Sequence, residues 1–170
     1  MKTGFIGLGI MGRPMAKNLL KAGMDLMVAD LNKDAVAEVT ACGATEGTYA
    51  EIGAQCERII LMVPSGAISK SILFGQDGVA STIQRGSIVC DMSSVTPGES
   101  RECYEQLKSI GVDFLDAPVS GGEPGAVNAT LAIMASGESK VFEKMQPYFS
   151  ILESSALLIG GPGSDGDSVP

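Results

Sequence analysis

The fold is indicated by a glycine-rich stretch near the first residue, Gly4-Phe5-Ile6-Gly7-Leu8-Gly9-Ile10-Met11-Gly12. An apolar run in it is typical of a buried strand, and behind that run Met11, Met15 and Leu19 recur every four residues, as on one face of a helix. A Gly-x-Gly-x-x-Gly pattern alone is common by chance. It becomes specific when a strand precedes it, a helix follows it and an acidic residue ends the next strand, all within about 30 residues. Asp30 is that acidic residue, so the segment predicts a dinucleotide-binding βαβ unit.

Each glycine of this turn has its own geometric role. Gly7 permits the tight turn, Gly9 lets the backbone approach a pyrophosphate, and Gly12 lets the helix pack closely on the strand. The N–H groups at the start of the helix then face the phosphates. The alternative is that the glycines serve only a tight turn between strand and helix. The candidate cofactor-binding residues of the turn are Gly7, Leu8, Gly9, Ile10, Met11 and Gly12.

The acidic residue Asp30 bears on the choice of cofactor. Its carboxylate would accept hydrogen bonds from the adenosine ribose hydroxyls and would repel a 2′-phosphate, which favours NAD over NADP. Lys33 and Arg13 lie close enough in the sequence to soften that preference, so NADP stays possible.

Short apolar runs alternate with amphipathic segments along almost the whole chain, which is typical of an α/β protein with a parallel sheet. We expect strands near residues 4–8, 25–29, 44–46, 58–63, 87–91, 112–115, 130–135 and 156–159, the one at 44–46 being the weakest. We expect helices near residues 11–22, 33–42, 66–74, 97–110 and 139–152. Thr96 and Glu99 form a capping-box pattern at the start of the fourth helix.

These elements predict one Rossmann-type, doubly wound α/β domain over residues 1–160, with a mainly parallel sheet and helices on both faces. From Gly160 the sequence changes to glycine, proline and small polar residues. Residues 161–170 therefore predict a flexible tail.

The composition excludes several classes of function. A net charge of −8 argues against nucleic acid or an anionic membrane as the main partner, because both require clustered cations. The absence of histidine excludes histidine bases, Ser-His-Asp triads and His-ligated metal sites. The four cysteines show no CxxC spacing, so we expect no metal site and free thiols in a reducing cytoplasm. The longest strictly apolar runs have five residues, too few to cross a bilayer.

Residues that directly follow the predicted strands are the next candidates, because ligands of a doubly wound sheet bind at the carboxyl ends of its strands. Val63-Pro64 and Ser93-Ser94 could reach the nicotinamide half of a cofactor, or they could simply end a strand and form a turn. In Ser120-Gly121-Gly122, a hydroxyl precedes two unhindered backbone N–H groups, a compact cradle for a carboxylate. The alternative there is a flexible glycine turn.

Two motifs together resemble the β-hydroxyacid dehydrogenases. The first is the opening glycine stretch with Pro14-Met15-Ala16 and Asn18-Leu19 behind it, and the second is Asp116-Ala117-Pro118-Val119-Ser120-Gly121-Gly122. The resemblance covers about residues 3–160. It implies an NAD- or NADP-dependent enzyme that reversibly transfers a hydride between nicotinamide C4 and the carbonyl carbon of a three- or four-carbon acid. It leaves open whether that substrate is tartronate semialdehyde or methylmalonate semialdehyde.

The resemblance also assigns roles to individual residues. It implies that the dinucleotide is bound by Gly7, Gly9, Gly12 and Asp30, that Val63 and Pro64 line the nicotinamide ribose side, and that Ser94 touches the cofactor. It implies that the substrate carboxylate is held by Ser120, Gly121 and Gly122.

The family's catalytic lysine has no counterpart in this sequence. In the family it lies near the start of a long helix after the last strand, which leads into an all-helical second domain. By spacing it would fall near Val169, and no lysine follows Lys144. We therefore expect the helical domain to be absent, little activity from this chain alone, and self-association through apolar surface left exposed beside the Ser120 loop and the last strand. The alternatives are a non-catalytic NAD-binding or sensing module, and a small complete enzyme that uses Lys70 or water.

Overall fold

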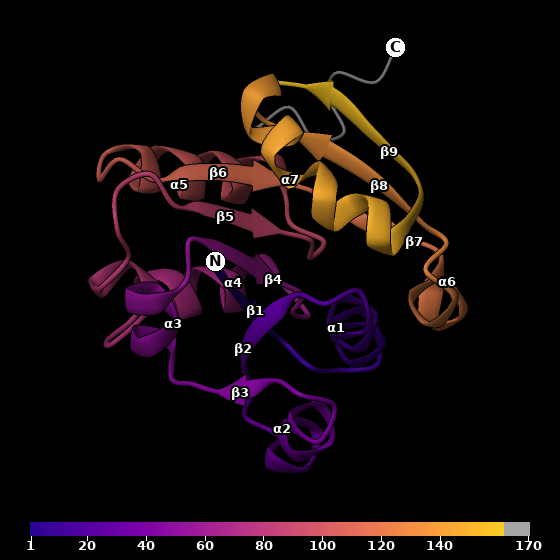
Figure 1. Ribbon diagram of the computed structural model, residues 1–170. Coiled ribbons are helices and arrows are strands. Elements are labelled where there is room, and N and C mark those ends of the chain that lie inside the picture. Colours follow the sequence, from indigo (N-terminus) through magenta and orange to yellow (C-terminus); the bar gives the residue numbers. More distant parts are fainter. Residues whose placement is uncertain (162–170) are drawn as a thin grey trace.

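The strands of the protein form one sheet. A computed structural model describes residues 1–161, and within them nine strands pair in the order β3-β2-β1-β4-β5-β6-β8-β7, with β9 beside β8 (Figure 1). The strands are β1 (Lys2–Ile6), β2 (Asp25–Ala29), β3 (Thr45–Glu46), β4 (Arg58–Leu61), β5 (Ile88–Asp91), β6 (Asp113–Asp116), β7 (Val119–Ser120), β8 (Leu131–Ser136) and β9 (Glu153–Gly160). Pairing from β3 through to β6 is parallel, whereas β8 runs antiparallel to β6 and β7.

Helices cover both faces of this sheet. They are α1 (Gly12–Lys21), α2 (Lys33–Thr40), α3 (Tyr49–Gln55), α4 (Gly66–Phe74), the 3₁₀ turn η1 (Val79–Ser81), α5 (Pro97–Lys108), α6 (Gly122–Asn128) and α7 (Ser139–Leu152). The buried side chains fall into two clusters, because successive residues of a strand point to opposite faces. One cluster joins the strands to α1, α2 and α7, and the other joins them to α3, α4 and α5. The predicted doubly wound α/β fold is therefore confirmed.

The order of the strands reverses at β1, which has β2 on one side and β4 on the other. Ligands of a doubly wound sheet bind in the crevice outside the carboxyl ends of the strands at such a point. The segments that follow β1, β2 and β4 are therefore the candidates for ligand binding.

Most of the predicted elements are present, and the differences have local causes. The first strand ends at Ile6 rather than near residue 8, because Gly7 has a φ of +106° and leaves the extended conformation. Helices α3 and α6 and the short strand β7 were not expected from the sequence. Of the predicted tail, residues 162–170 lie outside the described residues.

Candidate functional site

A cavity of about 450 Å³ lies at the carboxyl ends of β1 and β4. It brings together eight of the residues predicted to bind a cofactor: Gly7, Gly9, Ile10, Met11, Gly12, Asp30, Val63 and Pro64. The rest of its lining is mostly apolar and consists of Ile6, Leu31, Tyr49, Met62, Ile68 and Ile72. Leu8 does not line the cavity, because its side chain is buried in the core.

At two of the three motif positions, neighbouring backbone atoms lie so close that only glycine fits. A Cβ on Gly7 would lie 2.1 Å from the carbonyl oxygen of Met62, and a Cβ on Gly12 would lie 1.9 Å from the carbonyl oxygen of Gly7. No side chain fits at such distances. A Cβ on Gly9 would meet no atom within 4 Å, so the space over this residue is open.

Helix α1 presents its N-terminus to the same cavity. Its N-cap residue, Met11, makes no side-chain capping hydrogen bond, and the first turn contains no acidic residue. The first N–H groups of a helix lack intrahelical acceptors and carry the positive end of the helix dipole. The arrangement is one that attracts an anion.

The Asp30 carboxylate is fixed by backbone hydrogen bonds. Its Oδ2 accepts from the N–H of Leu8 at 2.6 Å, and its Oδ1 accepts from the N–H of Asn32 at 2.7 Å. The first bond joins the end of β2 to the glycine turn, so Leu8 contributes through its backbone. Since a carboxylate has about four acceptor positions, Asp30 retains capacity for further donors.

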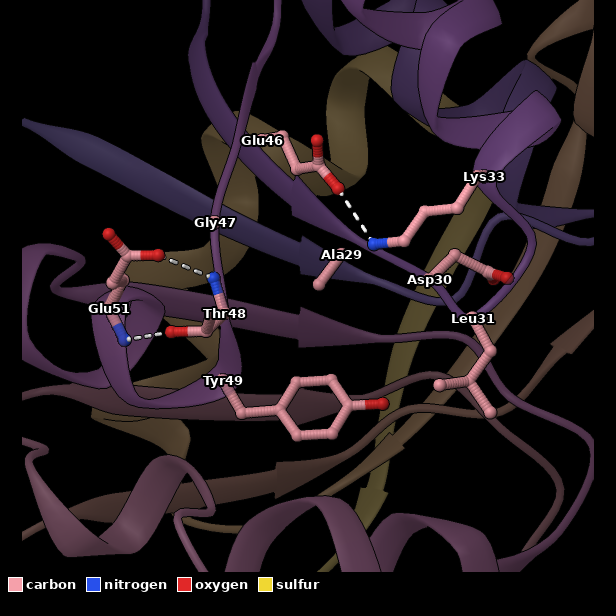
Figure 2. A pocket seen from close by; sticks show the side chains of 9 residues that line it. All are labelled: Ala29, Asp30, Leu31, Lys33, Glu46, Gly47, Thr48, Tyr49 and Glu51. Atoms are coloured by element: carbon pink, nitrogen blue, oxygen red, sulfur yellow. Dashed lines mark hydrogen bonds and ion pairs between the residues drawn. The ribbon is translucent and has the colours of Figure 1, made fainter.

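A second cavity of about 400 Å³ adjoins the first, since both are lined by Asp30, Leu31 and Tyr49. Figure 2 shows Lys33 and Glu46 pointing toward one another in it, with Nζ and Oε2 2.9 Å apart. Burial raises the pKa of the Tyr49 hydroxyl, and the negative charge of Asp30 adds to that effect. The remaining residues that line it are Ala29, Gly47, Thr48 and Glu51.

The sequence did not indicate that Tyr49 and Glu46 would line a cavity. Tyr49 is the first residue of the unexpected helix α3, and Glu46 lies shortly before it on β3. Thr48 and Glu51 close a capping box at its start: the Thr48 hydroxyl accepts from the N–H of Glu51, and the Glu51 carboxylate accepts from the N–H of Thr48 at 2.9 Å (Figure 2). This Thr-x-x-Glu signature was the signal that could have located the helix.

The wall formed by Val63 and Pro64 is held by Ser93 rather than by its neighbour. The Ser93 Oγ accepts from the N–H of Val63 at 2.9 Å, and the N–H of Ser93 donates to Asp91 Oδ1 at 3.0 Å. Asp91 is 1% exposed, and its burial raises the pKa of its carboxyl. Ser94, by contrast, is exposed and does not line the cavity, so its contact with a cofactor stays a prediction.

The residues predicted to hold a substrate carboxylate lie on a separate, exposed loop. Ser120 ends β7, Gly121 has a φ of +136°, and Gly122 begins α6. All three are exposed and lie outside both cavities. The loop is anchored through Asn18 of α1, whose Nδ2 donates to the carbonyl oxygen of Ala126 in α6 at 2.9 Å.

Metal binding and membrane crossing find no support within residues 1–161. No group of three or more Cys, Asp or Glu side chains there could hold a metal ion, and no helix there is long and apolar enough to cross a membrane. The four cysteines are free, and burial raises the pKa of Cys56 to about 11 and that of Cys103 to about 12. These two thiols are therefore protonated at neutral pH. Lys70 pairs with Glu102 and lines neither cavity.

Comparisons with known proteins agree with this geometry. Residues 2–160 match the family described as the NAD binding domain of 6-phosphogluconate dehydrogenase. The chain is 40% identical over 163 residues to the 2-hydroxy-3-oxopropionate reductase of Escherichia coli, covering 96% of this chain and 56% of the relative. It is 36% identical to the mitochondrial 3-hydroxyisobutyrate dehydrogenase of Rattus norvegicus, covering 95% of this chain and 49% of the relative.

Among solved structures, the 3-hydroxyisobutyrate dehydrogenase of Mycobacterium tuberculosis with L-serine superimposes with a TM-score of 0.90 at 29% identity, covering 95% of this chain and 55% of that one. The chain thus spans about half the length of the relatives that it matches. On the match over residues 2–160, this chain is an NAD(P)-binding domain and belongs to the family of NAD binding domains found in the β-hydroxyacid dehydrogenases.

Proposed function

We propose that this chain is the cofactor-binding part of an oxidoreductase that transfers a hydride between nicotinamide and a small β-hydroxyacid or its semialdehyde. The observation that carries the proposal is the cavity at the reversal point of the sheet, where the glycine turn, the start of α1 and Asp30 meet. The bound nicotinamide would supply or accept the hydride. The residues of this chain bind and orient it.

The groups around the cavity fit a dinucleotide. The open space over Gly9 and the N-terminus of α1 would receive the pyrophosphate, and Asp30 would accept hydrogen bonds from the adenosine ribose hydroxyls. Val63 and Pro64 would form the wall beside the nicotinamide ribose. Asp30 adds negative charge where a 2′-phosphate would lie, which supports NAD over NADP.

For the substrate we propose tartronate semialdehyde, which is reduced to glycerate, and as the alternative a specificity like that of 3-hydroxyisobutyrate dehydrogenase. The support is the sequence identity to two relatives, one named as a reductase of 2-hydroxy-3-oxopropionate, which is tartronate semialdehyde, and the other named as a 3-hydroxyisobutyrate dehydrogenase. Ser120 and the N–H groups of Gly121 and Gly122 would hold the carboxylate, because they follow β7 at the same edge of the sheet as the cavity.

We further propose that these 170 residues have little activity by themselves, because no lysine follows Lys144 to serve as the family's proton donor. They would also self-associate. Met134 and Leu157 are register partners on β8 and β9, and both side chains are exposed beside the strand that carries the Ser120 loop. Gel filtration measures the oligomeric state, and the fluorescence of a hydrophobic dye measures exposed apolar surface. A monomer that binds no dye would contradict the proposed self-association.

The test of the proposed function combines binding with turnover. NADH binding is followed by its fluorescence, and NADH oxidation is followed with tartronate semialdehyde, with a complete reductase of the family as the positive control. We expect binding with turnover near background. Turnover close to that of the control would show that this chain supplies its own proton donor, whereas no NADH binding would overturn the proposal. Binding without turnover, together with a defined partner in a pull-down, would favour a sensing module.

A further inference from the structure

We propose that Glu46 is a specificity-determining residue, which disfavours NADP by holding the Lys33 ammonium away from the position of a 2′-phosphate. This inference rests on the proposed function, because it requires the adenosine ribose to bind at Asp30. Glu46 would be a second determinant of cofactor choice beside Asp30, and it would act by holding a lysine in an ion pair.

The topology places Glu46 next to the ribose position. Glu46 lies on β3 opposite Val28 of β2, and Asp30 lies two residues after Val28, directly after the end of β2. Lys33 is the first residue of α2, and all three charged side chains line the second cavity. Figure 2 shows the Lys33–Glu46 ion pair beside Asp30.

A carboxylate partner for Lys33 is favoured by local electrostatics. A cation at the first position of a helix faces the positive end of the helix dipole, so a carboxylate nearby is favourable. The side chains of Lys33 and Glu46 are 76% and 49% exposed, and exposed ion pairs contribute little to folding. Breaking the pair should therefore change the charge of the cavity without unfolding the protein.

The charges that line the second cavity disfavour a phosphate as long as this pair persists. The charged side chains that line it are three carboxylates and one ammonium, those of Asp30, Glu46, Glu51 and Lys33. The ammonium is bonded to Glu46. The other cation that the sequence places nearby, Arg13, pairs instead with Glu38 at 3.4 Å.

A matched pair of variants tests the proposal by fluorescence titration with NADH and NADPH. Glu46→Gln removes one negative charge and frees Lys33, so we expect NADPH to bind about fivefold more tightly relative to NADH. Glu51→Gln removes the same charge from the same cavity, but Glu51 bonds the N–H of Thr48 and glutamine can still cap α3. Its effect should stay below about twofold, since the ion pair of Lys33 is with Glu46 and the Glu51 charge is screened by solvent.

A double variant decides whether Lys33 carries the effect. Adding Lys33→Met to Glu46→Gln should return the ratio of the two dissociation constants to the wild-type value. An unchanged ratio in Glu46→Gln, an equal change in Glu51→Gln, or a gain that survives Lys33→Met would each overturn the proposal. Circular dichroism melts verify that all variants fold.

The failure of this proposal can be told apart from failure of the proposed function. If the wild type binds NADH and Asp30→Ala lowers its preference for NADH, while Glu46→Gln leaves the ratio unchanged, only the role of Glu46 is wrong. If the wild type binds no NADH, both proposals fall.

Discussion

The glycine turn after β1 and the Ser120 loop after β7 lie at the same edge of the sheet, yet they are built differently. At the turn, hypothetical Cβ atoms on Gly7 and Gly12 would collide with backbone carbonyl oxygens. On the loop, both glycines have a positive φ, but hypothetical Cβ atoms there would lie nearest to side-chain atoms rather than backbone carbonyls. A Cβ on Gly121 would lie 3.3 Å from Leu131 Cδ2 and one on Gly122 would lie 3.6 Å from Pro124 Cδ, while Ser120 is exposed. The glycine turn is thus fixed by contacts within this chain, whereas the Ser120 loop is open to solvent.

The largest effect is expected at Gly12, in the glycine turn. Gly12→Ala forces a methyl group against the Gly7 carbonyl, so we expect a loss of about 3–5 kcal/mol in unfolding free energy and of NADH binding. Gly9→Ala is the matched variant, because its methyl group enters open space. Its unfolding free energy should stay within about 1 kcal/mol of wild type, while NADH binding weakens about tenfold or more. Urea titrations and NADH fluorescence measure both, and equal stability losses would contradict the steric argument.

The next largest effect is expected at Asp30, whose carboxylate is held beside the glycine turn by two backbone N–H groups. Asp30→Ala would remove the charge-assisted hydrogen bonds that we propose between Asp30 and the ribose, so NADH should bind about tenfold to a hundredfold more weakly and NADPH less so. Asp34→Ala is the control, since Asp34 is an exposed carboxyl of α2 that lines neither cavity. A ratio of NADH to NADPH affinity that does not fall in Asp30→Ala would remove Asp30 from the site.

The sequence predicted the glycine turn and most of the parallel strands because each is encoded locally. Periodicity locates a strand or a helix, and the capping box of Thr96 and Glu99 is present as expected. Helix α6 was missed because its sequence, which begins Gly-Glu-Pro-Gly, has low helix propensity. It is held by tertiary contacts instead, through the buried Ala126 and the bond from Asn18.

Parts of the site were beyond sequence reasoning for a related physical reason. Which of two adjacent serines faces inward depends on the buried Asp91, and no periodicity distinguishes Ser93 from Ser94. Lys33 and Glu46 are thirteen residues apart and meet only because β3 pairs with β2. Such contacts follow from the register of the assembled sheet.

A smaller effect, on stability, is expected from the buried carboxyl under the Val63 wall. Burial raises the pKa of Asp91 above its ordinary value of 3.8, so the folded state retains a proton that the unfolded chain releases. This contribution to stability is present below about pH 4 and is lost as the pH rises through the raised pKa.

Asp91→Asn should remove that dependence. Relative to wild type, its unfolding free energy should rise between about pH 4 and pH 7, by at most about 1.4 kcal/mol per pH unit. Urea titrations across this range measure it, with Asp25→Asn at an exposed position as the control for charge. Parallel pH profiles of Asp91→Asn and wild type would show that the carboxyl titrates alike in both states.

The smallest effect on folding stability and on NADH affinity is expected at Ser120. Because the side chain is exposed and lies outside both cavities, Ser120→Ala should change the unfolding free energy by less than about 0.5 kcal/mol and NADH affinity by less than about twofold. Binding of glycerate in the presence of NADH, followed by NMR shifts of the Gly121 and Gly122 amides, should weaken. Ser139→Ala, at another exposed serine, should leave glycerate binding unchanged. A tenfold loss of NADH affinity in Ser120→Ala would mean that the loop closes on the cofactor and that the two regions form one site.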